Sequence, residues 1–134
     1  FAFAHGRNQL LRVITQNIDR LHIDAGVPEA RVTELHGQCR SCACIACHAE
    51  GDLPAALAGV RSGEAPIPRC TTCETGVLKV DTVSFGQPLP EEGWTAAINA
   101  VDAADLLIVM GSALMVARSR LKRAFFMALK CNAS

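Results

Sequence analysis

The stretch Arg12-Val13-Ile14-Thr15-Gln16-Asn17-Ile18-Asp19 decides the fold class, because a short β-branched run passes directly into polar residues. Such a run predicts a buried strand that delivers a loop at its carboxyl end, which is where open α/β sheets place ligands. An amide and a carboxylate there can bind a carboxamide or ribose hydroxyls. The alternative is local, since Asn17 and Asp19 are also typical turn formers, and Asp19 can cap a short helix that Gly26 ends.

Strands and helices alternate along the rest of the chain. We expect strands at 31–35 and 106–110, the second fully buried in a parallel sheet, and extended segments at 77–80 and 82–85. Helices are expected at 53–60, 94–104 and 118–130. This order predicts an α/β sheet that is interrupted by a small metal-binding module.

The cysteines favour a metal site. Six of the seven lie between positions 39 and 73, and the pairs Cys44-x-x-Cys47 and Cys70-x-x-Cys73 each place two thiolates on one tight turn. Two such pairs complete the tetrahedral four-sulfur set of a structural zinc, which leaves no coordination position open for substrate. The pair Cys39-x-x-Cys42 can compete for the first turn, and free thiols in a loop are the plainer alternative.

Two further strand ends can carry chemistry. His36 precedes Gly37 at the end of the strand 31–35, and an imidazole with an ordinary pKa of about 6.5 suits proton abstraction at neutral pH. A structural histidine is the alternative. Gly111, Ser112 and Ala113 follow the strand 106–110 and can contact phosphates or a ribose through backbone amides, although any strand-to-helix turn has a similar sequence.

Composition narrows the classes of function. Thirteen basic residues balance thirteen acidic ones, which argues against nucleic acid or an anionic membrane as the main partner. Uninterrupted apolar runs such as residues 106–110 are far short of the roughly 20 residues that span a bilayer. The chain opens on Phe1 without a charged leader and ends on an apolar stretch, so we expect a fragment of a longer domain.

Taken in order, these motifs resemble those of the sirtuins, the family of NAD-dependent protein deacylases. Residues 15–26 resemble the family's T-Q-N-I/V-D-x-L-H-x-x-A-G motif, and residues 35–37 its L-H-G. Residues 83–90 are similar to V-x-F-G-E-x-L/V-P, and residues 111–116 to G-S/T-S-L-x-V, in a form closest to the class II branch. The chain departs from the family pattern with Val80 for proline, Gln87 for glutamate and Ala113 for a second hydroxyl.

The resemblance implies a fold and a reaction. The fold would be a partial Rossmann-like NAD-binding domain at 1–37 and 77–134, with a zinc-binding module at 38–76. The reaction would release nicotinamide from NAD and move the acyl group of an acyl-lysine onto ADP-ribose. Since the family's glycine-rich NAD loop would precede Phe1 and its adenosine-binding loop would follow Ser134, we expect little or no activity from these residues alone.

The resemblance also implies a role for each site residue. His36 would be the general base for a ribose hydroxyl. The NAD-binding residues would be Thr15, Gln16, Asn17, Ile18, Asp19, Gly111, Ser112 and Ala113. The substrate peptide would pair by strand addition with Val83, Phe85 and Gly86. Structural zinc would be held by Cys44, Cys47, Cys70 and Cys73.

Other functions stay open. One is a catalytically inactive, zinc-stabilised fragment that acts as a binding module, and another is class II-type ADP-ribosyl transfer or lipoamide cleavage. The partners implied by the resemblance are acylated-lysine proteins, with neither nucleic acid nor a membrane involved. The expected compartment is the cytoplasm for a bacterial source and the mitochondrial matrix for a eukaryotic one.

Overall fold

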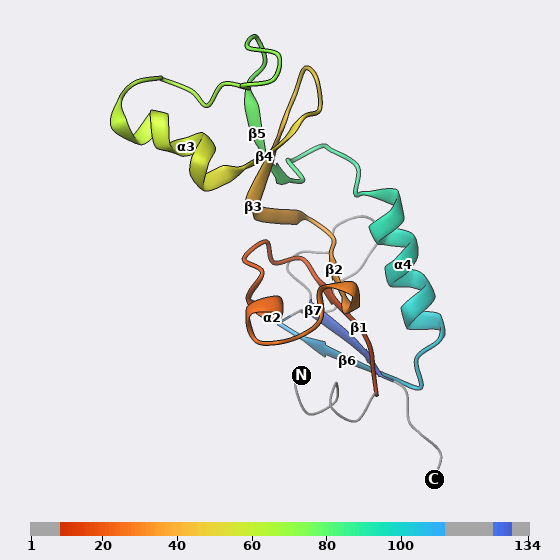
Figure 1. The fold of residues 1–134 in the computed structure, drawn as a ribbon. Helices are drawn as coiled ribbons and strands as arrows, with labels where there is room; N and C mark the ends of the chain where they lie inside the picture. The colour runs from red at the N-terminus through yellow and green to blue at the C-terminus, as the bar shows by residue number, and fades with distance from the viewer. Residues whose placement is uncertain (1–8, 112–124, 130–134) are drawn as a thin grey trace. The chain divides into compact units, whose positions relative to one another are not determined.

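The computed structural model describes residues 9–111 and 125–129, and these form two compact units (Figure 1). The first unit runs up to Gly37 and resumes at Val83, and the second spans Gln38–Thr82. The second unit continues past residue 76, the expected end of the metal-binding module, because the strand that follows this residue pairs within the second unit. Among the described residues, no helix has the length and apolar content needed to cross a membrane.

The first unit is a four-stranded sheet with short helical segments. Its elements are β1 (Leu10–Thr15), α2 (Leu21–Asp24), the 3-10 turn η1 (Glu29–Arg31), β2 (Val32–Glu34), α4 (Glu91–Asp102), β6 (Leu106–Met110) and β7 (Phe125–Leu129). The strand order is β2-β1-β7-β6, with β1 parallel to β2 and β7 antiparallel to both β1 and β6. Consequently β2, β1 and β6 share one direction. The predicted α/β class, with parallel strand pairing and an inserted cysteine module, is confirmed.

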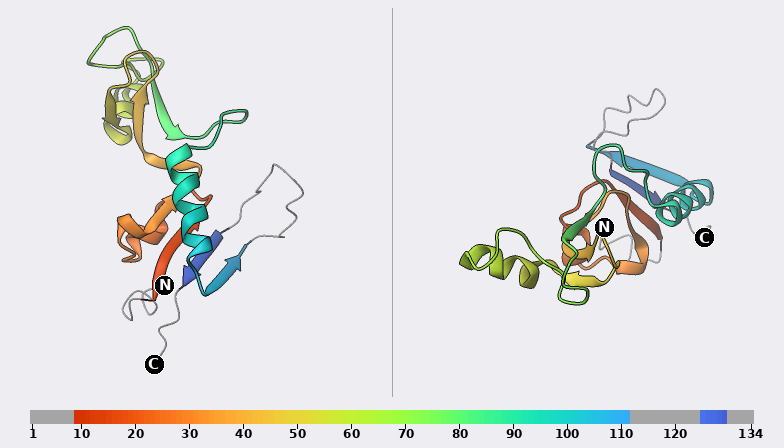
Figure 2. Two further views of the ribbon diagram at one scale, coloured as in Figure 1. Left: turned by 90° about the vertical axis from the view of Figure 1, so that its right-hand side faces the viewer. Right: turned by 90° about the horizontal axis from the view of Figure 1, so that it is seen from above.

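Each face of β1 carries a core cluster. Ile14 lies in one cluster with Leu35 and with Ala97 of α4, the helix that lies along β1 and β2 in Figure 2. Val13 lies in the other cluster with Leu10. In a regular strand, residues three apart point to opposite faces. Leu10 and Val13 nevertheless share a cluster, because the register of β1 shifts between Leu10 and Arg12. Burial on both faces makes β1 the centre of this unit.

Two expectations for the C-terminal part are wrong. The strand at 106–110 exists, but it is an edge strand that pairs antiparallel, and Leu106, Leu107 and Met110 are 47%, 38% and 40% exposed rather than fully buried. Residues 125–129, expected within a helix at 118–130, form β7, and the rest of that expected helix lies outside the described residues. A short apolar run suits either a helix or a strand, and here the pairing positions offered by β1 and β6 decide.

The second unit has almost no apolar core. Its strands are β3 (Gly37–Cys44), β4 (Glu50–Asp52) and β5 (Leu78–Thr82), in the order β4-β3-β5, with helix α3 (Leu53–Ser62) after β4 (Figure 1). The predicted helix at 53–60 is confirmed: Asp52 caps it by accepting from Ala55 N at 2.8 Å, and Pro54 lies in its first turn. No side chain of α3 is buried, and the buried apolar residues of this unit are Cys42, Cys44 and Cys70.

Candidate functional site

The four cysteines of the two C-x-x-C pairs form one cluster in the second unit. The sulfurs of Cys44, Cys47, Cys70 and Cys73 all lie within 4.8 Å of one another. Two facing pairs, Cys44 with Cys73 and Cys47 with Cys70, have sulfur–sulfur distances of 3.7 Å. A tetrahedral zinc with bonds of about 2.3 Å would hold its sulfurs about 3.8 Å apart. The spacing of the sulfurs therefore fits a zinc ion.

The main chain around the cluster favours charged sulfurs. Gly76 N donates to Cys73 Sγ at 3.3 Å, and this hydrogen bond lowers the pKa of Cys73 to about 6. The backbone N–H of Cys73 likewise lowers the pKa of Cys70. Although Ala49 N–H lowers the pKa of Cys47, desolvation and the neighbouring sulfurs outweigh it and raise that pKa to about 12. A divalent cation would resolve this conflict, because it stabilises all four thiolates at once.

The sequence leaves open whether Cys39 with Cys42 or Cys44 with Cys47 is the first pair of the metal site, and the structure selects between them. Cys42 Sγ is not among the clustered sulfurs but donates to Gly51 O at 3.4 Å, and desolvation by burial raises its pKa. Cys39 is half-buried and belongs to no potential metal cluster among the described residues. Cys44 with Cys47 therefore forms the first pair of the cluster.

Sequence reasoning missed one residue of the metal site, Gly76. Its Cα lies so close to the cluster that an added Cβ would stand 2.2 Å from Cys44 Sγ and 3.1 Å from Cys73 Sγ. Only a residue without a side chain fits this position. The available signal was a glycine three residues after the second cysteine pair.

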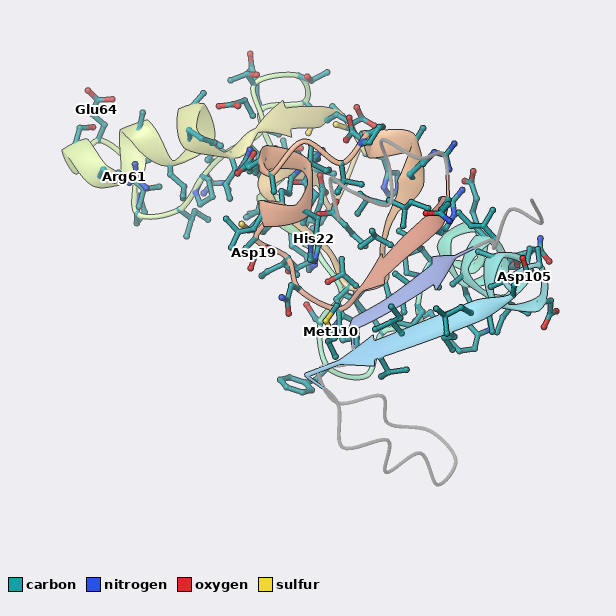
Figure 3. The ribbon with its side chains drawn as sticks, turned by 90° about the horizontal axis from the view of Figure 1, so that it is seen from below. Asp19, His22, Arg61, Glu64, Asp105 and Met110 are labelled. Carbon is teal, nitrogen blue, oxygen red and sulfur yellow. The ribbon has the colours of Figure 1, made fainter. Side chains whose placement is uncertain are left out.

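The sheet register of the first unit brings three expected site segments to one edge. Thr15 is opposite both Glu34 of β2 and Phe125 of β7, and Met110 is opposite the same Phe125. The carboxyl ends of β1, β2 and β6 therefore lie in one row, with Thr15 and Met110 two strand spacings, or about 10 Å, apart. Figure 3 labels Met110 at the end of β6 that lies toward Asp19, and Asp105 at the other end.

The loop after β1 combines buried and exposed polar groups. Thr15 and Gln16 are buried, whereas Asn17 and Ile18 are exposed at the sheet edge. Thr15 Oγ1 accepts from Asn17 N, and Asp19 Oδ1 accepts from Leu21 N at the start of α2, each at 3.0 Å. The expected turn-forming role of Asp19 is thus realised, while the amide side chain of Asn17 faces solvent.

His36 links this loop to the segment after β5. Its Nδ1 lies 3.2 Å from Gln16 O, and its own carbonyl oxygen accepts from Val83 N at 2.9 Å. The ring is half-buried. If Nδ1 carries the hydrogen and donates to Gln16 O, the lone pair is on Nε2, which becomes the atom that can accept a proton.

The segment 82–85 departs from the expected extended form beyond Thr82, where β5 ends. Residues 84–87 close a turn, Gly86 has a φ of 85°, and Phe85 is fully exposed. Gly111 also adopts a positive φ of 68°, which suits a glycine at the end of β6. Ser112 and Ala113, the other expected NAD contacts there, lie outside the described residues.

Comparison with known proteins gives consistent matches. The sequence model of the Sir2 family matches residues 2–118. The chain is 38% identical over 110 residues to NAD-dependent protein deacetylase SIR2rp1 of Trypanosoma brucei brucei, an alignment that covers 82% of this chain and 30% of that protein. It is 43% identical over 108 residues to NAD-dependent protein deacetylase 2 of Streptomyces coelicolor, which covers 79% of this chain and 43% of that protein. The chain thus spans less than half the length of these relatives.

Solved structures agree with these matches. A structure of Sir2Tm bound to a propionylated peptide superposes with a TM-score of 0.66 and 32% identity, over 73% of this chain and 39% of that one. A structure of Sir2 with a p53 peptide and NAD+ superposes with a TM-score of 0.58 and 34% identity, over 64% and 34%.

Proposed function

Since the chain belongs to the Sir2 family, the sirtuins, we propose that it carries the centre of an NAD-dependent protein deacylase. Curated relatives that it matches are NAD-dependent protein deacetylases and deacylases. Support from the chain itself is the common edge at which β1, β2 and β6 end. In open α/β sheets this edge is where nucleotide ligands bind.

The contact between His36 Nδ1 and Gln16 O, at 3.2 Å, carries the proposal. A backbone carbonyl can only accept, so Nδ1 is the protonated nitrogen of the neutral ring and Nε2 is the basic one. In this role the Nε2 atom of His36 would accept the proton of a ribose hydroxyl. The Nδ1 contact orients the ring before any ligand arrives, and the hydrogen bond from Val83 N holds the main chain of residue 36.

The donor set at the edge fits NAD. Gln16 and Asn17 provide amides for a carboxamide, Asp19 provides a carboxylate for hydroxyls, and Gly111 allows close approach of a backbone at the end of β6. Thr15, Ile18, Ser112 and Ala113 complete the proposed NAD-binding set. When bound, NAD would supply the ribose that receives the acyl group and the nicotinamide that leaves.

The acyl-lysine peptide is proposed to pair with residues Val83, Phe85 and Gly86. Val83 N is bonded to the carbonyl oxygen of His36, so the peptide segment and the proposed base share one main-chain link. Solved relatives bind a p53 peptide and a propionylated peptide. Zinc at the four-cysteine cluster would be structural, because four thiolates fill its coordination shell.

The narrower proposal is a class II-like sirtuin, which rests on the similarity of residues 111–119 to that branch. ADP-ribosyl transfer and lipoamide cleavage are the alternative reactions of the same site. The proposed compartment is the cytoplasm for a bacterial source and the mitochondrial matrix for a eukaryotic source.

A segment exchange tests the proposal. Residues 9–111 replace the matching segment of the Streptomyces coelicolor relative, and nicotinamide release is measured with NAD and an acetyl-lysine peptide. We expect turnover that His36→Asn lowers by about 100-fold or more, the contribution of a general base. The matched control is His48→Asn, because His48 is exposed and has a φ of 60°, which asparagine tolerates.

Two outcomes would contradict the proposal. Equal turnover with His36→Asn would exclude this residue as the base. A folded, zinc-loaded exchange protein that binds acyl-peptide without any nicotinamide release would instead support the alternative function, a binding module without catalysis.

A further inference from the structure

Residues 84–87 form a turn that one side chain closes. Gln87 Oε1 accepts from Ser84 N at 2.8 Å, and Gln87 N donates to Ser84 O at 3.0 Å. Both main-chain polar groups of Ser84 are therefore bonded to the same residue. Pro88 follows, and it restricts Gln87 to extended backbone conformations, which helps to hold the turn in this form.

Strand pairing along residues 83–86 is incompatible with this turn. A chain segment that accepts a paired strand is extended, with the N–H and C=O of successive residues pointing to alternate sides. Here Ser84 N donates to Gln87 Oε1 and Gln87 N donates to Ser84 O, so residues 84–87 are held in a turn instead. An incoming strand would need the extended form, and the side chain of Gln87 helps to keep the turn closed.

Hydrogen bonds, rather than packing, hold this turn. Phe85 at its tip is fully exposed, and a Cβ added at Gly86 would meet no atom within 4 Å. Ser84 and Gln87 are themselves exposed. Loss of the side-chain bond should therefore loosen the turn without disturbing a core.

We propose that Gln87 is a positioning residue that caps the peptide-binding edge, so that an acyl-lysine peptide must displace its side chain from Ser84 N to pair there. The proposal rests on the proposed function, because it concerns the same substrate segment. Proteins prevent unwanted strand pairing at free edges with charged side chains, proline, bulges or covering loops. The cap lowers the affinity for every peptide by the free energy needed to open the turn.

Gln87→Met and Gln87→Glu test the cap as a matched pair. Methionine keeps the length of the side chain but has no strong acceptor, whereas glutamate keeps the acceptor oxygen. The first measurement is amide hydrogen exchange at Ser84 in the free 134-residue chain. We expect exchange to become about 2- to 10-fold faster in Gln87→Met, the range that one hydrogen bond covers, and to stay at or below the unsubstituted rate in Gln87→Glu.

The second measurement is the affinity for a fluorescein-labelled acetyl-lysine peptide, followed by anisotropy, with the unacetylated peptide as control. We expect Gln87→Met to bind about 2- to 10-fold more tightly than the unsubstituted chain, as one removed hydrogen bond predicts, and Gln87→Glu to restore the original affinity. Unchanged exchange at Ser84 would overturn the cap itself. Faster exchange with equal or weaker peptide binding would overturn its role at the edge.

The proposed function is judged by a different comparison. Binding of the acetylated peptide, but not of the unacetylated one, by the unsubstituted chain supports a peptide site whatever Gln87 does. If no variant binds either peptide while Gln87→Met exposes Ser84 N, the peptide site assigned to residues 83–86 is wrong and Gln87 caps no substrate edge.

Discussion

Replacing Gly76 by alanine would place a methyl group inside the cluster of four sulfurs. The new Cβ would stand 2.2 Å from Cys44 Sγ, so the sulfur has to move by roughly 1.3 Å to reach an ordinary contact of about 3.5 Å. Zinc–sulfur bonds tolerate deviations of only about 0.2 Å. Cys73 Sγ at 3.1 Å and Ala46 Cβ at 3.2 Å leave the methyl group little room to shift the other way. We therefore expect the variant to lose one of four ligands.

The magnitude follows from the energy of a structural zinc site. Such sites supply about 10–16 kcal/mol in zinc-finger peptides, so one ligand in four corresponds to about 2.5–4 kcal/mol. This is about a 100-fold or greater loss of zinc affinity. Competition with a chromophoric chelator measures the affinity, and the zinc content of the purified protein measures the stoichiometry.

Gly59→Ala in α3 is the control for a glycine substitution in the same unit. A Cβ at Gly59 would meet only Glu64 Oε2 at 3.8 Å, so alanine should stabilise the helix by about 0.5–1 kcal/mol and leave zinc affinity unchanged. The fluorescence of Trp94, the single tryptophan and a residue of α4, reports on the first unit during the same experiments. Equal zinc affinity in Gly76→Ala and the unsubstituted chain would refute the assignment of this cluster as the metal site.

Three further predictions concern the pH dependence of the metal site and the stability of each unit. In the metal-free chain the pKa of Cys73 falls from its ordinary 9.0 to about 6, so its thiolate stabilisation is complete above pH 9 and is lost as the pH falls through 6. Zinc affinity, measured by competition with a chelator, should therefore fall as the pH falls through 6, because protons then compete for the sulfur; an affinity independent of pH would contradict the assignment. Asp52→Ala should cost about 1 kcal/mol in a urea titration of the second unit because it removes the cap on Ala55 N, whereas Asp52→Asn should retain most of it. Leu35 is 2% exposed, so Leu35→Ala should destabilise the first unit by about 2–5 kcal/mol in unfolding detected by Trp94 fluorescence. Leu21 is 60% exposed, so Leu21→Ala should change the stability little. Similar losses in the two variants would contradict the core assignment.

The parts predictable from sequence are those set by neighbouring residues. The β-branched run before Thr15 forms β1, and Asp52 and Pro54 start α3 as capping rules require. The prediction of the sirtuin family is confirmed by the match over residues 2–118. The assignments of His36 and of the NAD and peptide residues stay predictions that the segment exchange and the Gln87 variants can test.

The misses concern residues whose state depends on distant partners. Residues 125–129 have a composition that suits a helix or a strand, and they became β7 because β1 and β6 offer pairing positions on both sides. The exposure of Leu106 and Leu107 likewise follows from the place of β6 at the sheet edge. The side-chain hydrogen bond that helps to close residues 84–87 depends on one rotamer of Gln87, which no sequence pattern specifies.

The sequence by itself determined the family, the strand before Thr15, the helix after Asp52 and the presence of a four-cysteine site, because each depends on spacing along the chain. Only the tertiary structure decided that Cys44 rather than Cys39 or Cys42 joins the cluster, and that Gly76 must lack a side chain. It also aligned Thr15, Glu34 and Met110 at one edge through their registers with neighbouring strands. Contacts of this kind join segments far apart in sequence, so strand order and register decide them rather than local residue preference.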